Sequence, residues 1–464
     1  MQEIELKLQI PTQQQAAIAK TFNKKNSKSI DLHARYFDTN DNLLAKHLTA
    51  LRIRKEGQHW IQTLKSASES HLQRFEHEID LGSAENVPEL NLAAYLDIPQ
   101  AKYILNHALG QSWDGLILQF ETIVQRKFRL IDINNSQIEL CLDRGLLRSQ
   151  HDEAIIHEVE FELKHGSIRD LIFLTHDWVQ RYGIWLDVRS KAERGNLLAQ
   201  GKKVSPATTS QSVKLNSKIS PDQALRTIVA NCLEQILPNV AAIADHIAED
   251  SHIHQARVGI RRLRSALKSF KAWSTEVDPH WQAQLREIFS ELGASRDESI
   301  VFQDILPKIP NDVVTWQHQP LNTGIPKVLS DILQDSFSNQ LWLSLLNFAY
   351  APSVESKSKI KLQTQANQIL KRLYKKILQD ANQYSQLHIE QQHQFRKDLK
   401  QLRYSIEFLS SLYPKNTVRD FLSNIEPLQD ALGQFNDVIV AQRVLQVHTE
   451  QTPQLWFAVG WLHA

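Results

Sequence analysis

The sequence opens with Glu3-Ile4-Glu5-Leu6-Lys7-Leu8, in which charged and apolar residues alternate strictly. Because successive side chains of a strand point to opposite faces, Glu3, Glu5 and Lys7 share one face and the three apolar residues share the other. A single strand of this kind would be an ordinary solvated edge. The pattern decides the fold because it returns several times along the first half of the chain.

Charged residues alternate with apolar residues in further short segments before about Asp187. A solvated sheet face does not require so many paired acids and bases. If the strands close into a small barrel, the alternation places one set of side chains inside and creates a polar chamber. The recurring charged positions are Arg52, Arg54, Lys65, Arg74, Glu76, Glu78, Asp80, Arg126, Glu139, Asp143, Glu158, Glu160 and Glu162.

The two signs of charge in this predicted chamber suit two chemical groups. Clustered carboxylates are the hard oxygen donors that Mg²⁺ or Mn²⁺ prefers. Arginine binds phosphate oxygens through a planar fork, and lysine binds them as a point charge. A polyphosphate held with a divalent cation satisfies both requirements. Singly, Glu78, Asp80 and Glu139 are better explained as solvated or paired charges, and Glu162 fits either a solvated or an interior position.

Composition restricts the classes of function. The chain has 464 residues, enough for two or three domains, and 53 basic against 52 acidic residues give a net charge of +1. This balance argues against binding nucleic acid through bulk charge. Cys141 and Cys232 have no metal or redox spacing, so we expect no disulfide. The acidic first residues do not resemble an export signal, and the apolar stretch around 341–351 is too short to cross a bilayer. We therefore expect a cytoplasmic protein with no membrane association.

The chain changes character near its middle. Up to about Asp187 the pattern predicts strands, with helical spacing over 88–111 and 167–182. Residues 201–212 are polar and show no apolar periodicity, whereas a long helical pattern begins at about Pro221. We predict an α+β multidomain protein with a β domain at 1–200, a linker at 201–218 and an all-α bundle at 219–464.

The helical half contains an internal duplication. Two basic stripes have the same spacing of three, four and three residues, so each lies on one helix face. Leu292-Gly293 follows the first stripe and Leu432-Gly433 follows the second. The two stripes are His254, Arg257, Arg261 and Arg264, and His393, Arg396, Lys400 and Arg403.

Charges of one sign along a helix face repel, so each stripe needs compensation. Salt bridges to acids such as Asp297, Glu407 and Asp437 would supply it within the chain. Two matching stripes related by a pseudo-twofold would instead meet as one basic surface on the bundle. The duplication favours this second interpretation, an anion site.

The first half resembles the CYTH domains, or triphosphate tunnel metalloenzymes. Glu3 to Lys7 matches the E-x-E-x-K signature of that family. The other matching segments are 36–39, 51–54, 63–65, Arg74 with Glu76, 142–145, 158–160 and 190–195. The resemblance implies an eight-stranded antiparallel tunnel that binds triphosphate.

Site residues follow from the resemblance by position. It implies that Glu3, Glu5, Glu158 and Glu160 bind the metal, with Asp143 close to them. It implies phosphate contacts from Arg52, Arg54, Arg74 and Arg126, and catalytic roles for Lys7, Lys65 and Lys191, with Glu76 as a weaker candidate. The strand of Arg126 departs from the family pattern, because Phe128 stands where a second basic residue is often found.

The second half, from about Ile219, resembles the CHAD domains. Residues 254–264 and 393–404 match the two halves of such a domain, whose members bind inorganic polyphosphate and often follow a CYTH domain. The resemblance implies that the two basic stripes form the polyphosphate site. The segment 311–361 shows little that matches.

The leading prediction is a hydrolase that converts inorganic triphosphate to diphosphate and phosphate with Mg²⁺ or Mn²⁺, tethered near polyphosphate by its helical domain. Two alternatives retain the tunnel. One is a different triphosphate substrate, because related domains are thiamine triphosphatases and adenylyl cyclases. The other is a polyphosphate sensor without catalytic activity.

Overall fold

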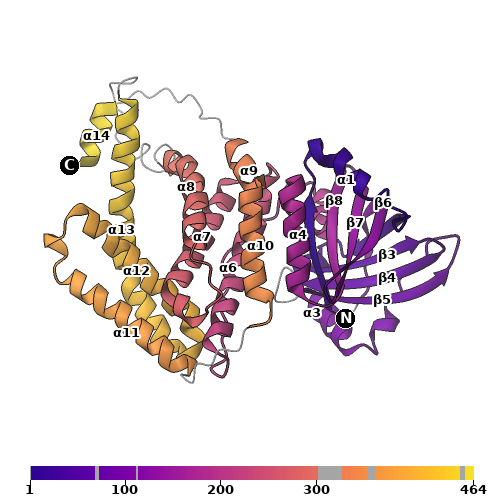
Figure 1. Cartoon of the computed structure of the whole chain (residues 1–464), viewed down its shortest axis with the longest axis horizontal. Helices are drawn as coiled ribbons and strands as arrows, with labels where there is room; N and C mark the ends of the chain where they lie inside the picture. Colours follow the sequence, from indigo (N-terminus) through magenta and orange to yellow (C-terminus); the bar gives the residue numbers. More distant parts are fainter. Residues whose placement is uncertain are drawn as a thin grey trace. The chain divides into compact units, whose positions relative to one another are not determined.

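The computed structural model describes residues 2–67, 73–110, 113–300, 327–353, 361–449 and 455–463. The chain divides into two compact units. The first consists of Met1–Ala207 and Leu333–Asn347, and the second of Thr208–Ile332 and Phe348–Ala464. Figure 1 shows strands in the first unit and helices throughout the second.

The first unit is built on an antiparallel sheet with the strand order β5-β4-β3-β2-β6-β7-β8-β1-β9. Strand β5 also pairs with β1, where Glu3 lies opposite Arg74, so β1 to β8 form a closed ring. The predicted eight-stranded antiparallel tunnel is therefore confirmed. Its strands are β1 (Gln2–Gln9), β2 (Lys28–Asp38), β3 (Thr49–Glu56), β4 (His59–Ala67), β5 (Gln73–Ser83), β6 (Ile117–Ile133), β7 (Ser136–Ser149) and β8 (Glu153–His165), with the short β9 (Trp185–Leu186) added beside β1.

The alternation in the sequence determines which side chains face outward from this ring. Leu51 and Leu64, on β3 and β4, pack in one cluster with Leu105 of α3 (Pro99–Leu109). On β8, Phe161 packs edge-on against Trp178 of α4 (Ile168–Tyr182). The apolar faces of the strands are thus covered by helices, which leaves the charged faces for the interior.

Helices occur in the first unit near the predicted positions. Segment 88–111 contains α3 and the short helix Ala93–Tyr95, and α4 begins after Ser167, whose hydroxyl accepts a hydrogen bond from the amide of Arg169. Shorter helices are α1 (Gln15–Thr21) and α2 (Leu43–Lys46). The last is α5 (Lys191–Ala199), where a Cβ at Gly195 would lie 2.0 Å from the Phe120 ring. Only glycine allows α5 to approach the sheet so closely.

The predicted linker, residues 201–218, contains no helix or strand. Its second half nevertheless packs on the second unit, since Val213 and Leu215 are buried and the amide of Leu215 donates to Ser411 Oγ at 2.8 Å. The first unit in turn includes Leu333–Asn347. There the buried Asn339 accepts a hydrogen bond from the amide of Leu186 at 2.8 Å.

The second unit repeats one order of elements. A long helix, α6 (Pro221–Ala244) or α11 (Leu362–Ala381), precedes a stripe helix, α7 (Asp250–Phe270) or α12 (Ile389–Leu409). A short 3₁₀ turn then leads to α8 (Trp281–Ile300) or α13 (Lys415–His448). The stripe helices touch each other, because Ser269 Oγ and Ser405 Oγ lie 3.1 Å apart. The remaining helices are α9 (Lys327–Gln334), α10 (Ser336–Tyr350) and α14 (Leu455–His463).

Among the described helices, α6 is long and apolar enough to span a membrane by length and composition alone. The sequence-based search for apolar stretches did not single it out. However, 72% of its most apolar window is buried within the protein. Such burial is typical of the central helix of a soluble bundle.

Candidate functional site

The charged faces of the strands meet inside the ring. Neighbouring strands place Lys65 opposite Glu76 and Arg126 opposite Asp143. Asp143 and Glu158 are almost completely buried, and Lys7 is 6% exposed. Since isolated buried charges are costly, acids and bases in such a chamber must compensate one another. Two groups of paired charges result.

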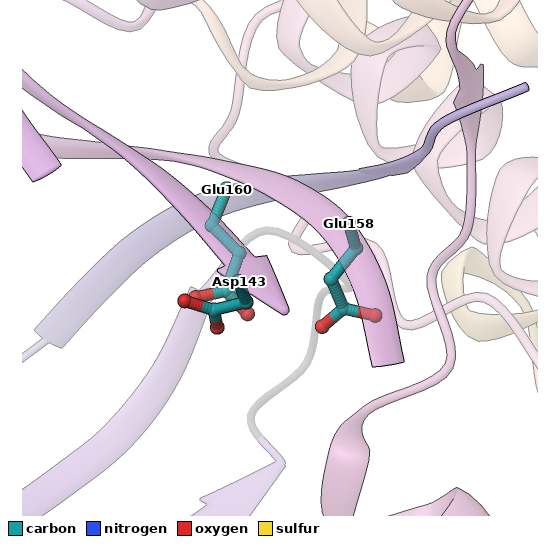
Figure 2. Close-up of side chains that lie close together, drawn as sticks. All are labelled: Asp143, Glu158 and Glu160. Carbon is teal, nitrogen blue, oxygen red and sulfur yellow. The ribbon is translucent and has the colours of Figure 1, made fainter. Parts of the chain in front are cut away.

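The first group centres on Asp143 of β7 and Glu158 and Glu160 of β8. One carboxylate oxygen from each lies within 4.8 Å of the other two. Figure 2 shows the carboxylates of Asp143 and Glu160 side by side, with that of Glu158 nearby. The ammonium of Lys191 contacts all three acids, at 2.7 Å from Asp143 and 2.6 Å from Glu158 and Glu160. The guanidinium of Arg126 lies 2.7 Å from Asp143 and 2.5 Å from Glu160.

This first group remains ionised despite its burial. Burial opposes ionisation of Glu160, but the adjacent Lys191 and Arg126 outweigh it and hold the pKa of that carboxyl well below its usual range. The pKa of Glu158 is lowered in the same way, because Arg194, Lys191 and Lys7 outweigh the effect of burial. The three carboxylates are therefore negatively charged at neutral pH.

These three carboxylates have the chemistry of a divalent-cation site. They supply hard oxygen donors in close proximity, as Mg²⁺ and Mn²⁺ require. Among the described residues, Glu158 Oε1 is buried and has no aligned hydrogen-bond donor, although Lys191 Nζ is near it. A buried anionic oxygen of this kind can coordinate a cation. The residues thus fit a divalent cation.

The second group lies across the β1–β5 closure. Lys65 Nζ is 2.8 Å from Glu3 and 3.0 Å from Glu76. Arg52 reaches the same Glu76 at 3.9 Å, and its guanidinium donates to the hydroxyl of Tyr36 at 3.4 Å. Burial opposes ionisation of Lys65, but Glu3, Glu5 and Glu76 together outweigh it and raise the lysine pKa. This group therefore presents cations at neutral pH.

The remaining predicted tunnel residues line the space beside these groups. Arg74 lies 3.8 Å from Glu5, and both line a hollow with Lys7. Burial, reinforced by Glu3 and Glu160, raises the pKa of Glu5. Burial lowers the pKa of Lys7.

Arg54 contacts Glu56 and lies 3.9 Å from Glu78. The interpretation of Glu78 and Asp80 as paired charges agrees with this contact and with the 3.2 Å approach of His59 to Asp80. Outside these groups, Glu139 and Glu162 both contact Lys164.

The predicted metal ligands do not all form one cluster. Asp143, which was expected only near the others, belongs to the group of three, whereas Glu3 contacts Lys65 instead. Sequence reasoning also missed Arg194, which contacts Glu158, and Asp187, whose carboxylate accepts from Gln9 at 2.9 Å. The spacing could have revealed Arg194, because it stands one helical turn after Lys191 on α5.

In the second unit, the first basic stripe surrounds one aromatic ring. The guanidinium carbons of Arg257, Arg261 and Arg264 lie 4.8, 5.3 and 5.8 Å from the ring centre of Phe289 on α8. Arg257 also donates to the carbonyl of Leu292 at 3.0 Å. A Cβ on the next residue, Gly293, would lie 2.7 Å from the end of this flexible side chain. His254, the first residue of the stripe, lies one turn before Arg257 on α7.

The second stripe, on α12, lies near the first. Arg261 of the first stripe acts electrostatically on both Arg396 and Lys400. Of the acids considered as partners, Glu407 pairs with Arg403 at 2.7 Å, and Asp437 acts on Arg396 and Lys400. The side chain of Asp297 lies outside the described residues. Among the described residues, both Glu407 and Asp437 thus act on cations of the second stripe. His393 is exposed at the start of its stripe.

Comparison with protein families agrees with the two units. The model of the CYTH domain matches residues 1–195, and that of the CHAD domain matches residues 227–446. The chain therefore contains a CYTH domain followed by a CHAD domain.

Three individual proteins are similar to parts of this chain. An inorganic triphosphatase from Haemophilus influenzae is 32% identical over 205 residues, which are 43% of this chain and 55% of that protein. The chain thus matches about half the length of this curated relative. The CHAD domain of the plant Ricinus communis is 27% identical with a TM-score of 0.43, covering 56% of this chain and 90% of that one. An adenylyl cyclase candidate from Hippeastrum with a dominant triphosphatase activity is 19% identical with a TM-score of 0.30, covering 44% and 97%.

Proposed function

We propose that this protein hydrolyses inorganic triphosphate to diphosphate and phosphate with Mg²⁺ or Mn²⁺, and that its helical domain binds inorganic polyphosphate. One observation carries the proposal: a closed ring of strands holds three ionised carboxylates beside Lys191 and Arg126. The similarity to an inorganic triphosphatase over 205 residues, at 32% identity, supports the choice of substrate.

The chain's own residues supply substrate binding. Arg52, Arg54, Arg74 and Arg126 would exchange carboxylate contacts for phosphate oxygens, and a low-dielectric chamber strengthens each new contact. Lys65 and Lys191 would do the same as point charges. A divalent cation held by Asp143, Glu158 and Glu160 would polarise water and stabilise the charge that develops on the leaving phosphate. Hydrolysis then depends on positioning and electrostatic stabilisation rather than on a protein nucleophile.

The polyphosphate part of the proposal depends on the two stripes. They bring Arg261 near Arg396 and Lys400, and such crowding of like charge is relieved by an anion. A polyanion releases condensed counterions when the cations of the stripes bind it, so its affinity should fall steeply as the salt concentration rises. The helical domain would then raise the local concentration of phosphate chains at the enzyme.

A substrate panel tests the first part. Phosphate and diphosphate release is measured from tripolyphosphate, ATP, thiamine triphosphate and long-chain polyphosphate, with Mg²⁺, Mn²⁺ or a chelator. We expect tripolyphosphate to be preferred and the chelator to abolish release. A cyclic product from ATP would change the substrate assignment, and inactivity on the whole panel would favour a sensor.

Matched variants separate the two sites. Glu158→Gln is expected to abolish release, and Glu153→Gln, at an exposed position of the same strand, should not. In the helical domain, Arg261→Ala combined with Arg403→Ala should weaken polyphosphate binding and spare turnover. The exposed Arg419→Ala, on α13, is the control. Loss of both properties in one variant would contradict the separation of sites.

A further inference from the structure

In each half of the helical unit, one residue on the helix after the stripe helix contacts a cation of the stripe. These two residues occupy the same position of the internal repeat. Phe289-Ser290-Glu291-Leu292-Gly293 on α8 aligns with Gln429-Asp430-Ala431-Leu432-Gly433 on α13, because the Leu-Gly pairs correspond. Phe289 and Gln429 therefore occupy equivalent positions. Each lies one helical turn before the Leu-Gly pair, and each faces the stripe helix of its own half.

In the first half, Phe289 contacts the stripe through its ring. Three guanidiniums lie within 6 Å of the ring centre, the distance over which the quadrupole of an aromatic ring attracts a cation. Such an interaction uses the planar face of a guanidinium and leaves its N–H edge available for other acceptors. The ring thus offsets part of the repulsion among three cations that are held close together.

In the second half, Gln429 performs this task by hydrogen bonding. Its side-chain oxygen accepts from Arg403 at 3.0 Å, and its amide nitrogen donates to the carbonyl of Leu399 at 3.2 Å. Gln429 is 6% exposed, so its geometry is fixed. Arg403 is the repeat equivalent of Arg264, which lies 5.8 Å from the Phe289 ring. The same cation is therefore oriented by different chemistry in each half.

We propose that Phe289 and Gln429 are positioning residues of the anion site, and that the first stripe depends on the aromatic ring to hold its three arginines in binding geometry. This inference rests on the proposed binding of polyphosphate. It predicts that the two stripes respond differently to substitution at one and the same repeat position. The first requires an aromatic ring or a hydrogen-bond acceptor there, and the second requires an acceptor.

The test uses the full-length protein and the fluorescence anisotropy of end-labelled long-chain polyphosphate at one fixed, low salt concentration. Phe289→Leu keeps an apolar side chain without the ring, and we expect it to weaken binding about threefold to tenfold. Phe289→Tyr should restore affinity. Phe289→Gln, which copies the second half, should fall between the two because it can accept from Arg264. The matched control is Phe421→Leu, which removes a ring elsewhere in the unit, beside Tyr374.

Thermal unfolding of every variant separates orientation from packing. The proposal requires that affinity for polyphosphate decrease from Phe289→Tyr to Phe289→Gln to Phe289→Leu. The unfolding temperatures of the three variants should be closely similar. Equal affinity of the Phe289→Leu variant and the wild type would overturn it, and so would equal losses in Phe289→Leu and Phe289→Tyr. If the leucine variant unfolds, the comparison of Phe289→Tyr with Phe289→Gln still decides the order. Failure of the wild type to bind would instead refute the proposed function itself.

Discussion

Polyphosphate binding should depend on pH because of one lysine. Burial, together with Arg261, Arg396 and Arg403, lowers the pKa of Lys400 to about 7, and Asp437 opposes this shift. A bound polyanion stabilises the ammonium form and must raise this pKa. Above about pH 7, binding therefore includes the uptake of one proton, which costs about 1.4 kcal/mol per pH unit. Below that pH the lysine is already charged and makes no pH-dependent contribution.

The expected magnitude follows from this linkage. Affinity should fall by up to about tenfold for each pH unit above 7, and it should level off once the pH exceeds the pKa of the lysine in the complex. The assay is anisotropy of labelled polyphosphate over about pH 6 to 9 at constant ionic strength, because salt alone changes affinity strongly. Lys400→Arg keeps the charge at every pH in this range and should remove the steep fall.

Other titratable groups lie in the same stripes. All of them are retained in the Lys400→Arg variant, so only the difference between the two pH profiles is assigned to this lysine. Lys400→Met should bind at low pH as weakly as the wild type binds at high pH. An identical pH profile for wild type and Lys400→Arg would refute the assignment of the titration to this lysine.

Three further outcomes follow from the tunnel. Lys191→Ala should tighten Mn²⁺ binding in a direct titration while lowering turnover, because the Lys191 ammonium competes with the metal ion for Asp143, Glu158 and Glu160. Unchanged Mn²⁺ affinity would contradict that competition. Since burial raises the pKa of Glu5, cation binding should strengthen, with release of a proton, as pH rises through the range in which this carboxyl titrates, which calorimetry in two buffers of different ionisation enthalpy would detect. Gly195→Ala should lower the free energy of unfolding by about 1–3 kcal/mol in denaturant titrations, because its Cβ would overlap the Phe120 ring.

Alternation indicated a shared polar chamber, and the resemblance to CYTH domains supplied the closed ring of eight strands. Charged residues at every second position of β1, β3 and β8 place their side chains on one face, and that face can bear so many charges only inside a shared chamber. The pairing of individual charges was not predictable in this way. It depends on the stagger between strands, which brings Lys65 to Glu3 across the β1–β5 closure although the two residues are 62 positions apart. Periodicity within one strand contains no information about that stagger.

The domain boundaries show a second limit. The composition of residues 201–218 predicted a linker, but two apolar residues, Val213 and Leu215, are enough to fix its second half to the helical unit. Likewise, Leu333–Asn347 lies within the helical half of the sequence yet belongs to the first unit. A buried amide, Asn339, satisfies the backbone of β9 there, and one hydrogen bond of this kind leaves no periodic signal.

The duplication was recognisable from spacing alone, whereas the difference between its halves was not. Spacing identifies which residues share a helix face, and both stripes pass that test equally. Phe289 and Gln429 lie on α8 and α13, the helices that follow the stripe helices. Because their side chains differ in chemistry, similarity between the two halves does not identify them as equivalent. The structure shows that both contact the stripe of their own half. Within an internal repeat, therefore, a position that differs in residue type but contacts equivalent residues is where the two copies are expected to have specialised.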